Sequence, residues 1–256
     1  MFAPVDCLLH LEGESVPRDV DMRTVERFLE AGRKSYPPKV GTVYGTLLND
    51  RASLDALGDA VNAAPYKAPP KAPILYVKPR NTFAGHGSLV ALPDSEQGVE
   101  VGGSLGIVIG KTACRVKEEE ALDFVGGYTT IADLSVPHAT VYRPSVRYRA
   151  RDNFCVIGPA VIASKHVEAP DALDISVAIN GQPSFRATTA TVVRGVAKLI
   201  ADVTDFMTLQ PGDVLTLGVP YGSPIGKAGD EVAIAINRWP MLKFSLTIDA
   251  AVGGAR

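Results

Sequence analysis

Cysteine is scarce in this chain of 256 residues, and its three cysteines lie far apart in the sequence. Cys7, Cys114 and Cys155 form no C-x-x-C pair, which argues against a disulfide framework and against a cysteine zinc site. The N-terminus shows no basic region followed by an apolar stretch and a cleavage site, so nothing predicts export. We therefore expect reduced thiols in a cytoplasmic protein.

Charge of one sign and long apolar runs are missing as well. The formal net charge is -2 and the sequence pI is about 6.1, which leaves no basic field for nucleic acid and no polybasic patch for a membrane surface. No apolar run approaches the roughly 20 residues of a membrane-spanning helix. We expect no nucleic-acid partner and no membrane partner.

Two common catalytic arrangements are also lacking. The glycine-rich stretch 101–110 has neither the lysine nor the helix start that a phosphate-binding loop needs. Ser104 has no histidine in a recognisable relation to it, so no nucleophile with an activating base is evident.

What the chain does contain is a large number of short apolar segments. With 46% hydrophobic and 21% charged residues it has ordinary globular composition. After residue 73 most segments are β-like and separated by Gly and Pro, whereas helical spacing occurs once in the first 39 residues and over 51–63, 117–125 and 190–206. We predict an α+β fold that is mostly β, with a small strand-helix extension over 1–39 and a body over 40–256.

One strand of this body has an unusual polar face. Side chains alternate along a strand, so Glu100, Gly102 and Ser104 share one face of the segment 100–110. A metal-binding strand would carry carboxylates there, and only Glu100 is acidic. About thirty residues later, Asp133 interrupts an otherwise apolar segment and is the expected partner of that face.

Several segments, in order along the chain, resemble the fumarylacetoacetate hydrolase family. They are 78–83 (KPRNTF), 105–111, 121–135, 151–159 (RDNFCVIGP) and 206–213 (FMTLQPGD). The resemblance implies a mixed β-roll fold with a few peripheral helices. Segments 53–81 and 142–155 are most similar to the isomerase/decarboxylase members of that family that act in 4-hydroxyphenylacetate degradation.

The family resemblance also implies a cofactor, a divalent magnesium or manganese ion held by Glu-x-Glu and one aspartate. Those positions are Gly102, Ser104 and Asp133 here, so Asp133 is the one candidate metal ligand that remains. Glu100 lies on the same face but about 6.5–7 Å away along the strand. We expect metal binding by this chain to be weak or absent, and Asp133 has the alternative role of a structural residue that bonds nearby backbone amides.

Other family positions have changed too. The Thr-Gly-Thr-Pro loop is replaced by 217–220 (LGVP), which has lost both hydroxyls, and the position of a catalytic histidine is Ser53. A lysine three residues before Asp152 is replaced by Arg149, which keeps a positive charge but cannot act as a base. The family's arginine after the aspartate corresponds to Pro137.

The remaining candidates are cationic or titratable. Arg149 and His86 are the candidate catalytic residues: Arg149 is predicted to lie with Arg147 and Arg151 on a strand face that is either solvated or anion-binding, and His86 is either a proton carrier or an exposed turn residue. The candidate substrate-binding residues are Lys78, Tyr142 and Arg143. Alternatively, Lys78 is an ordinary surface lysine, and Tyr142 and Arg143 hold a crossing loop in place. His138 and Asp133 form an alternative acid/base pair.

Three hypotheses follow. The chain is a subunit of an enzyme that decarboxylates 5-oxopent-3-ene-1,2,5-tricarboxylate and isomerises 2-hydroxyhepta-2,4-diene-1,7-dioate, as the resemblance implies. Alternatively it is a degenerate family member that supports a metal-containing homologue, or it is a metal-free isomerase. In each case the expected ligand is a small oxo- or hydroxy-dicarboxylate or tricarboxylate, and the expected assembly is a homodimer or a heteromer with a homologous metal-binding subunit.

Overall fold

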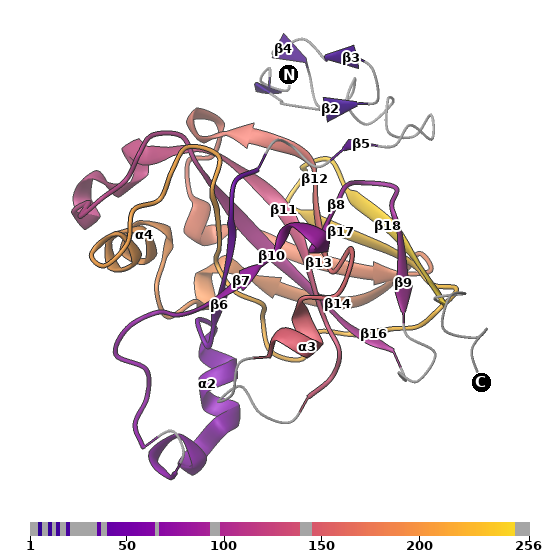
Figure 1. Cartoon of the computed structure of the whole chain (residues 1–256), viewed down its shortest axis with the longest axis horizontal. Helices are drawn as coiled ribbons and strands as arrows, with labels where there is room; N and C mark the ends of the chain where they lie inside the picture. The colour runs from indigo at the N-terminus through magenta and orange to yellow at the C-terminus, as the bar shows by residue number, and fades with distance from the viewer. Residues whose placement is uncertain are drawn as a thin grey trace.

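The computed structural model describes residues 40–64, 67–92, 98–138 and 145–248 in full (Figure 1). Within the first 39 residues it also gives the backbone of five two-residue strands, which are β1 (Val5–Asp6), β2 (His10–Leu11), β3 (Glu14–Ser15), β4 (Asp19–Val20) and β5 (Ser35–Tyr36). The helix that the sequence predicts in this region lies outside the described residues, and the boundary at residue 39 stays a prediction.

The larger sheet has eight strands and contains the unusual polar face. Its order is β7 (Ile74–Lys78), β6 (Val43–Leu47), β15 (Val214–Thr216), β10 (Val99–Ile109), β11 (Val125–Ser135), β12 (Cys155–Ala163) and β8 (Phe83–Ala84), with β16 (Ile225–Gly226) paired to β10. Strands β10 and β11 are antiparallel, and their register places Gly102 opposite Asp133. Asp133 therefore lies beside the polar face of β10, as its expected place in the same site requires.

The smaller sheet packs against one face of β10. Its order is β14 (Gln182–Thr188), β13 (Asp174–Ile179), β17 (Glu231–Ile236), β18 (Leu242–Ile248) and β9 (Leu89–Leu92). A Cβ added to Gly103 would lie 3.1 Å from Ile175 and 3.2 Å from Ile234, so this side of β10 faces the apolar core between the sheets. Because side chains alternate, Gly102 and Ser104 face the opposite side.

Helices are few in the described ranges, as predicted, and they are shorter than the spacing indicated. They are α2 (Arg51–Leu57), α3 (Val146–Arg149) and α4 (Val196–Thr204), with 3-10 turns η1 (Gly58–Asn62), η2 (Arg80–Thr82), η3 (Glu118–Phe124), η4 (Ser164–His166), η5 (Pro170–Ala172) and η6 (Thr189–Thr191). No helix in the described ranges is long and apolar enough to cross a membrane. The mixed β-roll with peripheral helices is thus the observed fold.

Two helix predictions need correction. The helix expected over 190–206 begins only at Val196, because Val192 is held in an extended bridge with Asp50 and Gly195 precedes the first turn. The segment 117–125 forms a 3-10 helix instead of an α-helix. In both segments, contacts with the rest of the fold override the local helical spacing.

Candidate functional site

The polar face of β10 opens into a cleft of about 440 Å³. Its titratable lining residues include Tyr76, Glu100, His138 and Arg149, which come from strands β7 and β10, the segment after β11, and helix α3. Helix α2 forms one wall, and the loop 219–223 forms another. The cleft therefore gathers residues that are far apart in the sequence on the face where the family resemblance places its chemistry.

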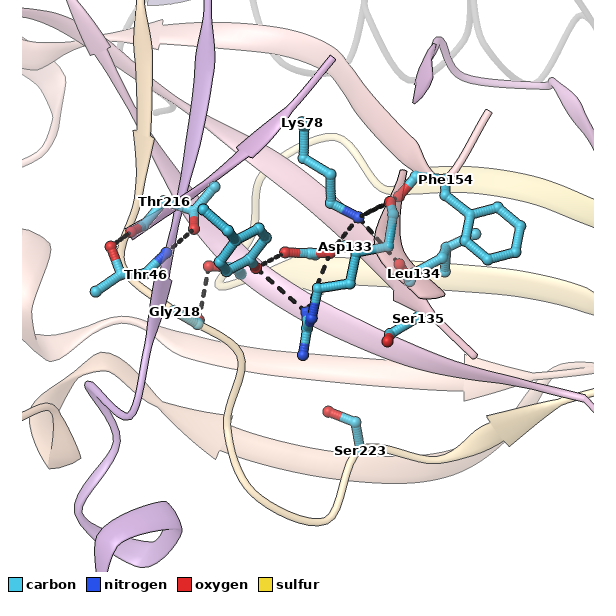
Figure 2. A network of polar contacts seen from close by, with 12 residues as sticks. Thr46, Lys78, Asp133, Leu134, Ser135, Phe154, Thr216, Gly218 and Ser223 are labelled. Carbon is cyan, nitrogen blue, oxygen red and sulfur yellow. Dashed lines mark hydrogen bonds and ion pairs between the residues drawn. The ribbon is translucent and has the colours of Figure 1, made fainter. Parts of the chain in front are cut away.

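An ion pair lies behind this cleft. Lys78 is 1% exposed, and its Nζ lies 2.5 Å from Asp133 Oδ1. The same ammonium group donates hydrogen bonds to the carbonyl oxygens of Leu134 (3.0 Å), Arg149 (3.0 Å) and Phe154 (2.9 Å), as Figure 2 shows for Leu134 and Phe154. Lys78 therefore neutralises Asp133 and also ties β11, α3 and the start of β12 together.

The second carboxylate oxygen of Asp133 accepts a hydrogen bond from a tyrosine. The Tyr76 hydroxyl donates to Asp133 Oδ2, and burial first, then the Asp133 charge, raises the pKa of Tyr76 well above its ordinary value. Tyr76 thus stays protonated and remains a donor. Arg149 donates from Nη1 to the Tyr76 hydroxyl at 3.3 Å, lies 3.7 Å from Asp133 Oδ1, and stacks 4.8 Å over the tyrosine ring.

The two lost glutamate positions are closed by the loop that follows β15. A Cβ added to Gly102 would lie 2.6 Å from the Val219 methyl carbons and 2.8 Å from the Asp133 carbonyl oxygen. Ser104 donates from Oγ to the Gly218 carbonyl oxygen at 2.7 Å. The changes at Gly102 and Val219 are therefore physically linked, since the valine fills the space that a longer side chain on the strand would need.

The walls of the cleft are held by Asp50, a residue that sequence reasoning missed. Its carboxylate caps helix α2 by accepting from the Ser53 amide at 3.2 Å, and it also accepts from the Tyr221 amide (3.1 Å) and the Thr191 hydroxyl (3.1 Å). An aspartate just before a helical pattern is an N-cap signal, so the cap could be read from the sequence. Its hydrogen bond with the loop 219–223 could not be read from the sequence.

These residues do not fit a divalent metal ion. A hard cation needs several oxygen ligands, and Asp133 offers one carboxylate whose two oxygens already face the Lys78 ammonium and the Tyr76 hydroxyl. Gly102 and Ser104 supply no carboxylate, and no group of three or more His, Cys, Asp or Glu that could hold a metal occurs within the ranges described above. Asp133 is also not the turn or cap residue of the alternative prediction, because side chains are its partners.

The predicted site residues are only partly brought together. Arg149 lines the cleft, and Lys78 and Asp133 lie directly behind it. The prediction that Lys78 is a surface residue is wrong, because the ammonium is fully buried. Tyr142 and Arg143 lie outside the described residues.

The predicted basic strand face of Arg147, Arg149 and Arg151 is also wrong. Residues 146–149 form helix α3, whose first turn is closed by the hydrogen bond from the Ala150 amide to the Val146 carbonyl at 2.8 Å. The backbone carbonyl of Arg149 accepts from Lys78, and that of Tyr148 accepts from the Val136 amide at 3.0 Å. These tertiary hydrogen bonds favour the helical turn over the extended chain.

His86 lies away from the cleft and is buried. It is 6% exposed, and its Nδ1 accepts a hydrogen bond from the Lys243 amide at 3.2 Å at the start of β18. The exposed-turn reading of His86 is therefore wrong. Burial, and secondarily the charge of Lys243, lowers the pKa of His86 from the ordinary 6.5 to about 4, against the opposite effect of a hydrogen bond with the Met241 backbone.

This lowered pKa predicts a loss of stability in mild acid. Since the unfolded chain binds the proton near pH 6.5 and the folded protein only near pH 4, stability falls as the pH drops through this window. We expect the His86 contribution to reach about 2–3 kcal/mol at pH 4. Urea unfolding at pH 7.5 and pH 4.5 measures it, with His86→Asn as a variant that keeps an acceptor but does not titrate; equal losses in both proteins would contradict the assignment.

Glu100 and His138 are two further polar residues that line the cleft. Burial raises the pKa of the Glu100 carboxyl, against the opposing charges of Arg149 and His138, and Asp133 raises it further. The His138 ring is stacked on Tyr148 with centroids 4.8 Å apart. Tyr76 was not singled out by the sequence, although it shares a face of β7 with Lys78 because the two residues are two positions apart.

Residues 42–247 match the sequence profile of the fumarylacetoacetate (FAA) hydrolase C-terminal family. The chain belongs to the fumarylacetoacetate hydrolase family. Family membership accounts for the two curled sheets and for the position of the cleft beside β10 and β11.

Curated members of the fumarylacetoacetate hydrolase family include isomerase/decarboxylases and hydrolases. A 4-hydroxyphenylacetate degradation bifunctional isomerase/decarboxylase of Escherichia coli is 38% identical over 203 residues, which cover 79% of this chain and 46% of that protein. A maleylpyruvate hydrolase of Aquipseudomonas alcaligenes is 32% identical over 166 residues, covering 64% of this chain and 56% of that protein. The chain thus spans about half the length of these curated relatives.

Solved structures of the family share the fold. A 5-carboxymethyl-2-hydroxymuconate delta-isomerase from Mycobacterium smegmatis superposes with a TM-score of 0.72 at 25% identity, covering 86% of this chain and 82% of that one. A fumarylpyruvate hydrolase from Pseudomonas aeruginosa in complex with Mn²⁺ and pyruvate has a TM-score of 0.73 at 21% identity, covering 97% of this chain and 99% of that one. At 21% identity, the similarity to the fumarylpyruvate hydrolase supports the shared fold alone.

Proposed function

We propose that this chain is a subunit of an isomerase/decarboxylase of 4-hydroxyphenylacetate breakdown and that it acts beside a homologous subunit that carries the metal ion. The observation that supports this most strongly is the ion pair of Asp133 with Lys78, which neutralises the carboxylate. In addition, Gly102 and Ser104 stand where the family has its two metal-binding glutamates.

The contribution of this chain is the binding of a carboxylate. The substrates of the proposed reactions, 5-oxopent-3-ene-1,2,5-tricarboxylate and 2-hydroxyhepta-2,4-diene-1,7-dioate, are anions with several carboxylates. Arg149 supplies a guanidinium that is held in place by Tyr76 and lies in the cleft, and a guanidinium is well suited to a carboxylate. The homologous subunit would supply the divalent ion that polarises the oxo group.

The test is reconstitution. The single chain and a homologue with an intact Glu-x-Glu are purified separately, and ion binding by each is measured by calorimetry with Mg²⁺ and with Mn²⁺. We expect no tight ion binding and no decarboxylation by this chain alone, and turnover above that of the homologue alone when the two are mixed. Full turnover and a tight Mn²⁺ site in the single chain would sink the proposal.

A metal-free isomerase is a second candidate, because Glu100 and His138 place two proton-carrying groups beside Arg149 in the same cleft. Its originally expected acid/base residue, His86, lies elsewhere, so Glu100 and His138 would take over that role. Isomerisation by the single chain in the presence of EDTA, abolished by Arg149→Ala, would favour this candidate. Turnover that needs both the partner and the metal would exclude it.

A further inference from the structure

Helix α2, which forms one wall of the cleft, lies at the periphery of the fold (Figure 1). Neither α2 nor the turn η1 that follows it contains a buried residue. A helix of seven residues is not stable by itself in water, and most helices in proteins are held by an apolar face that packs on the core. The position of α2 therefore depends to a large extent on contacts at its N-terminal end.

The chain enters α2 through a residue in a rare backbone conformation. Leu48 has a φ of 55°, in the left-handed region that residues other than glycine seldom adopt. Such a conformation is costly and persists where neighbouring contacts hold it in place. The next two residues supply these contacts, since Asn49 is 2% exposed and Asp50 is 7% exposed.

Asn49 holds the chain just before the loop 219–223. Its Nδ2 atom donates to the carbonyl oxygens of Leu217 at 2.8 Å and Arg194 at 3.0 Å, and its Oδ1 atom accepts from the Arg194 amide at 2.9 Å. None of these hydrogen bonds involves α2. Asn49 therefore anchors the start of the loop and does not link the two walls of the cleft.

Asp50 bonds both walls through the same carboxylate oxygen. Its Oδ2 atom accepts from the Ser53 amide in the first turn of α2, at 3.2 Å, and from the Tyr221 amide in the loop 219–223, at 3.1 Å. Its Oδ1 atom accepts from the Thr191 hydroxyl at 3.1 Å, which fixes the direction of the carboxylate. Among the residues that the structure describes, no other side chain forms hydrogen bonds with both α2 and this loop.

We propose that the Asp50 carboxylate couples the two walls of the cleft, so that α2 and the loop 219–223 open together and not separately. Asp50 is the N-cap of α2, so a movement of the helix carries the carboxylate away from the Tyr221 amide. A donor that loses its acceptor is costly when it stays inside the fold, so the loop follows the helix. The inference goes beyond the proposed function and does not rest on it, because neither a ligand nor a reaction enters it.

Amide hydrogen exchange of the full chain, followed residue by residue with NMR, measures the opening of each wall. The informative variant is Asp50→Ser, because a serine can still cap α2 but its side chain is too short to reach the Tyr221 amide as well. We expect exchange to become at least about tenfold faster at Tyr221 and, by a similar factor, in α2. The matched control is Asp55→Ser, at an exposed position of the same helix, which should leave both walls unchanged.

Several results of this comparison would overturn the proposal. Faster exchange at Tyr221 with unchanged exchange in α2 would show that the walls open separately. No change in either wall would show that the carboxylate holds neither of them. Equal acceleration in Asp50→Ser and Asp55→Ser would trace the effect to the helix in general and not to the carboxylate of Asp50.

A change in the loop itself keeps Asp50 and tests the coupling from the other side. Gly222 has a φ of 80°, so Gly222→Ala strains the loop, although the nearest atom to the added Cβ, on Phe185, is 3.8 Å away. Because coupling between two sites is reciprocal, this variant should speed exchange in α2 by at least about threefold. Gly229→Ala, at a φ of 93° in a different turn, is the matched control and should leave α2 unchanged.

The same change in the loop is then repeated in the Asp50→Ser protein. Without the shared carboxylate, Gly222→Ala should speed exchange in the loop alone. Exchange in α2 that ignores Gly222→Ala while Asp50 is present, or that responds equally with and without Asp50, would overturn the proposal. The variant that keeps Asp50 also decides the question if Asp50→Ser fails to fold.

Discussion

Replacing Lys78 with methionine is expected to lower the free energy of unfolding by about 3–5 kcal/mol. The ammonium group is the cation closest to the Asp133 carboxylate, at 2.5 Å, and the lysine is 1% exposed. Without it, a buried carboxylate would keep only the Tyr76 hydroxyl and the more distant Arg149 charge. The three carbonyl oxygens that the ammonium group joins would also lose a donor.

Urea unfolding followed by circular dichroism measures this loss. The matched control is Lys227→Met, at an exposed turn, which should leave the free energy of unfolding nearly unchanged. Removing the opposite charge tests the cause: Lys78→Met combined with Asp133→Asn should be more stable than the sum of the two single changes implies. Additive losses would show that Lys78 acts through its carbonyl contacts alone and not as the counter-ion of Asp133.

Restoring the family's glutamate at position 102 is expected to destabilise the protein by at least about 3 kcal/mol instead of rebuilding a metal site. The new Cβ would overlap the Val219 methyl carbons, at 2.6 Å, and approach the Asp133 carbonyl oxygen at 2.8 Å. The added carboxylate would have to displace Val219 to reach the cleft. Lys78 would still form its ion pair with Asp133, so the set of carboxylate ligands for a metal ion would remain incomplete.

Gly102→Glu and the double change with Val219→Ala are compared in the same unfolding assay, together with Mn²⁺ calorimetry. The double change should recover part of the lost stability because the smaller side chain frees the space above the strand. Neither protein should bind Mn²⁺ tightly. A stable Gly102→Glu protein with a tight Mn²⁺ site would contradict the conclusion that the valine and the lysine close the site.

The polar face of the strand at 100–110 was predictable because it follows from a local rule. Period-two alternation places Glu100, Gly102 and Ser104 on one face, and the observed contacts of all three with the cleft or its loop confirm this. The motif at 151–159 and its neighbours carried the family assignment, which the profile match over 42–247 confirms. Both inferences use residues that are close together in the chain.

The contacts and the local structure of the candidate site residues were not predictable in the same way. Lys78 was expected at a surface or at an anion, and its pairing with Asp133 joins residues 55 positions apart in the sequence. The arginines around residue 149 have the spacing of a strand, yet tertiary hydrogen bonds to Lys78 and Val136 favour a helical turn. His86 has glycine neighbours that suggest exposure, but the start of β18 covers it.

The sequence by itself determined the family, the mixed β-roll and the loss of two carboxylates from the strand at 100–110, because these depend on residue identity and short-range periodicity. Only the tertiary structure decided what that loss means. The folded chain brings the Lys78 ammonium to Asp133, places Val219 over Gly102, and gathers Glu100, His138 and Arg149 around one cleft. Each of these contacts joins distant segments, and its geometry is fixed only when the two sheets and their loops pack together.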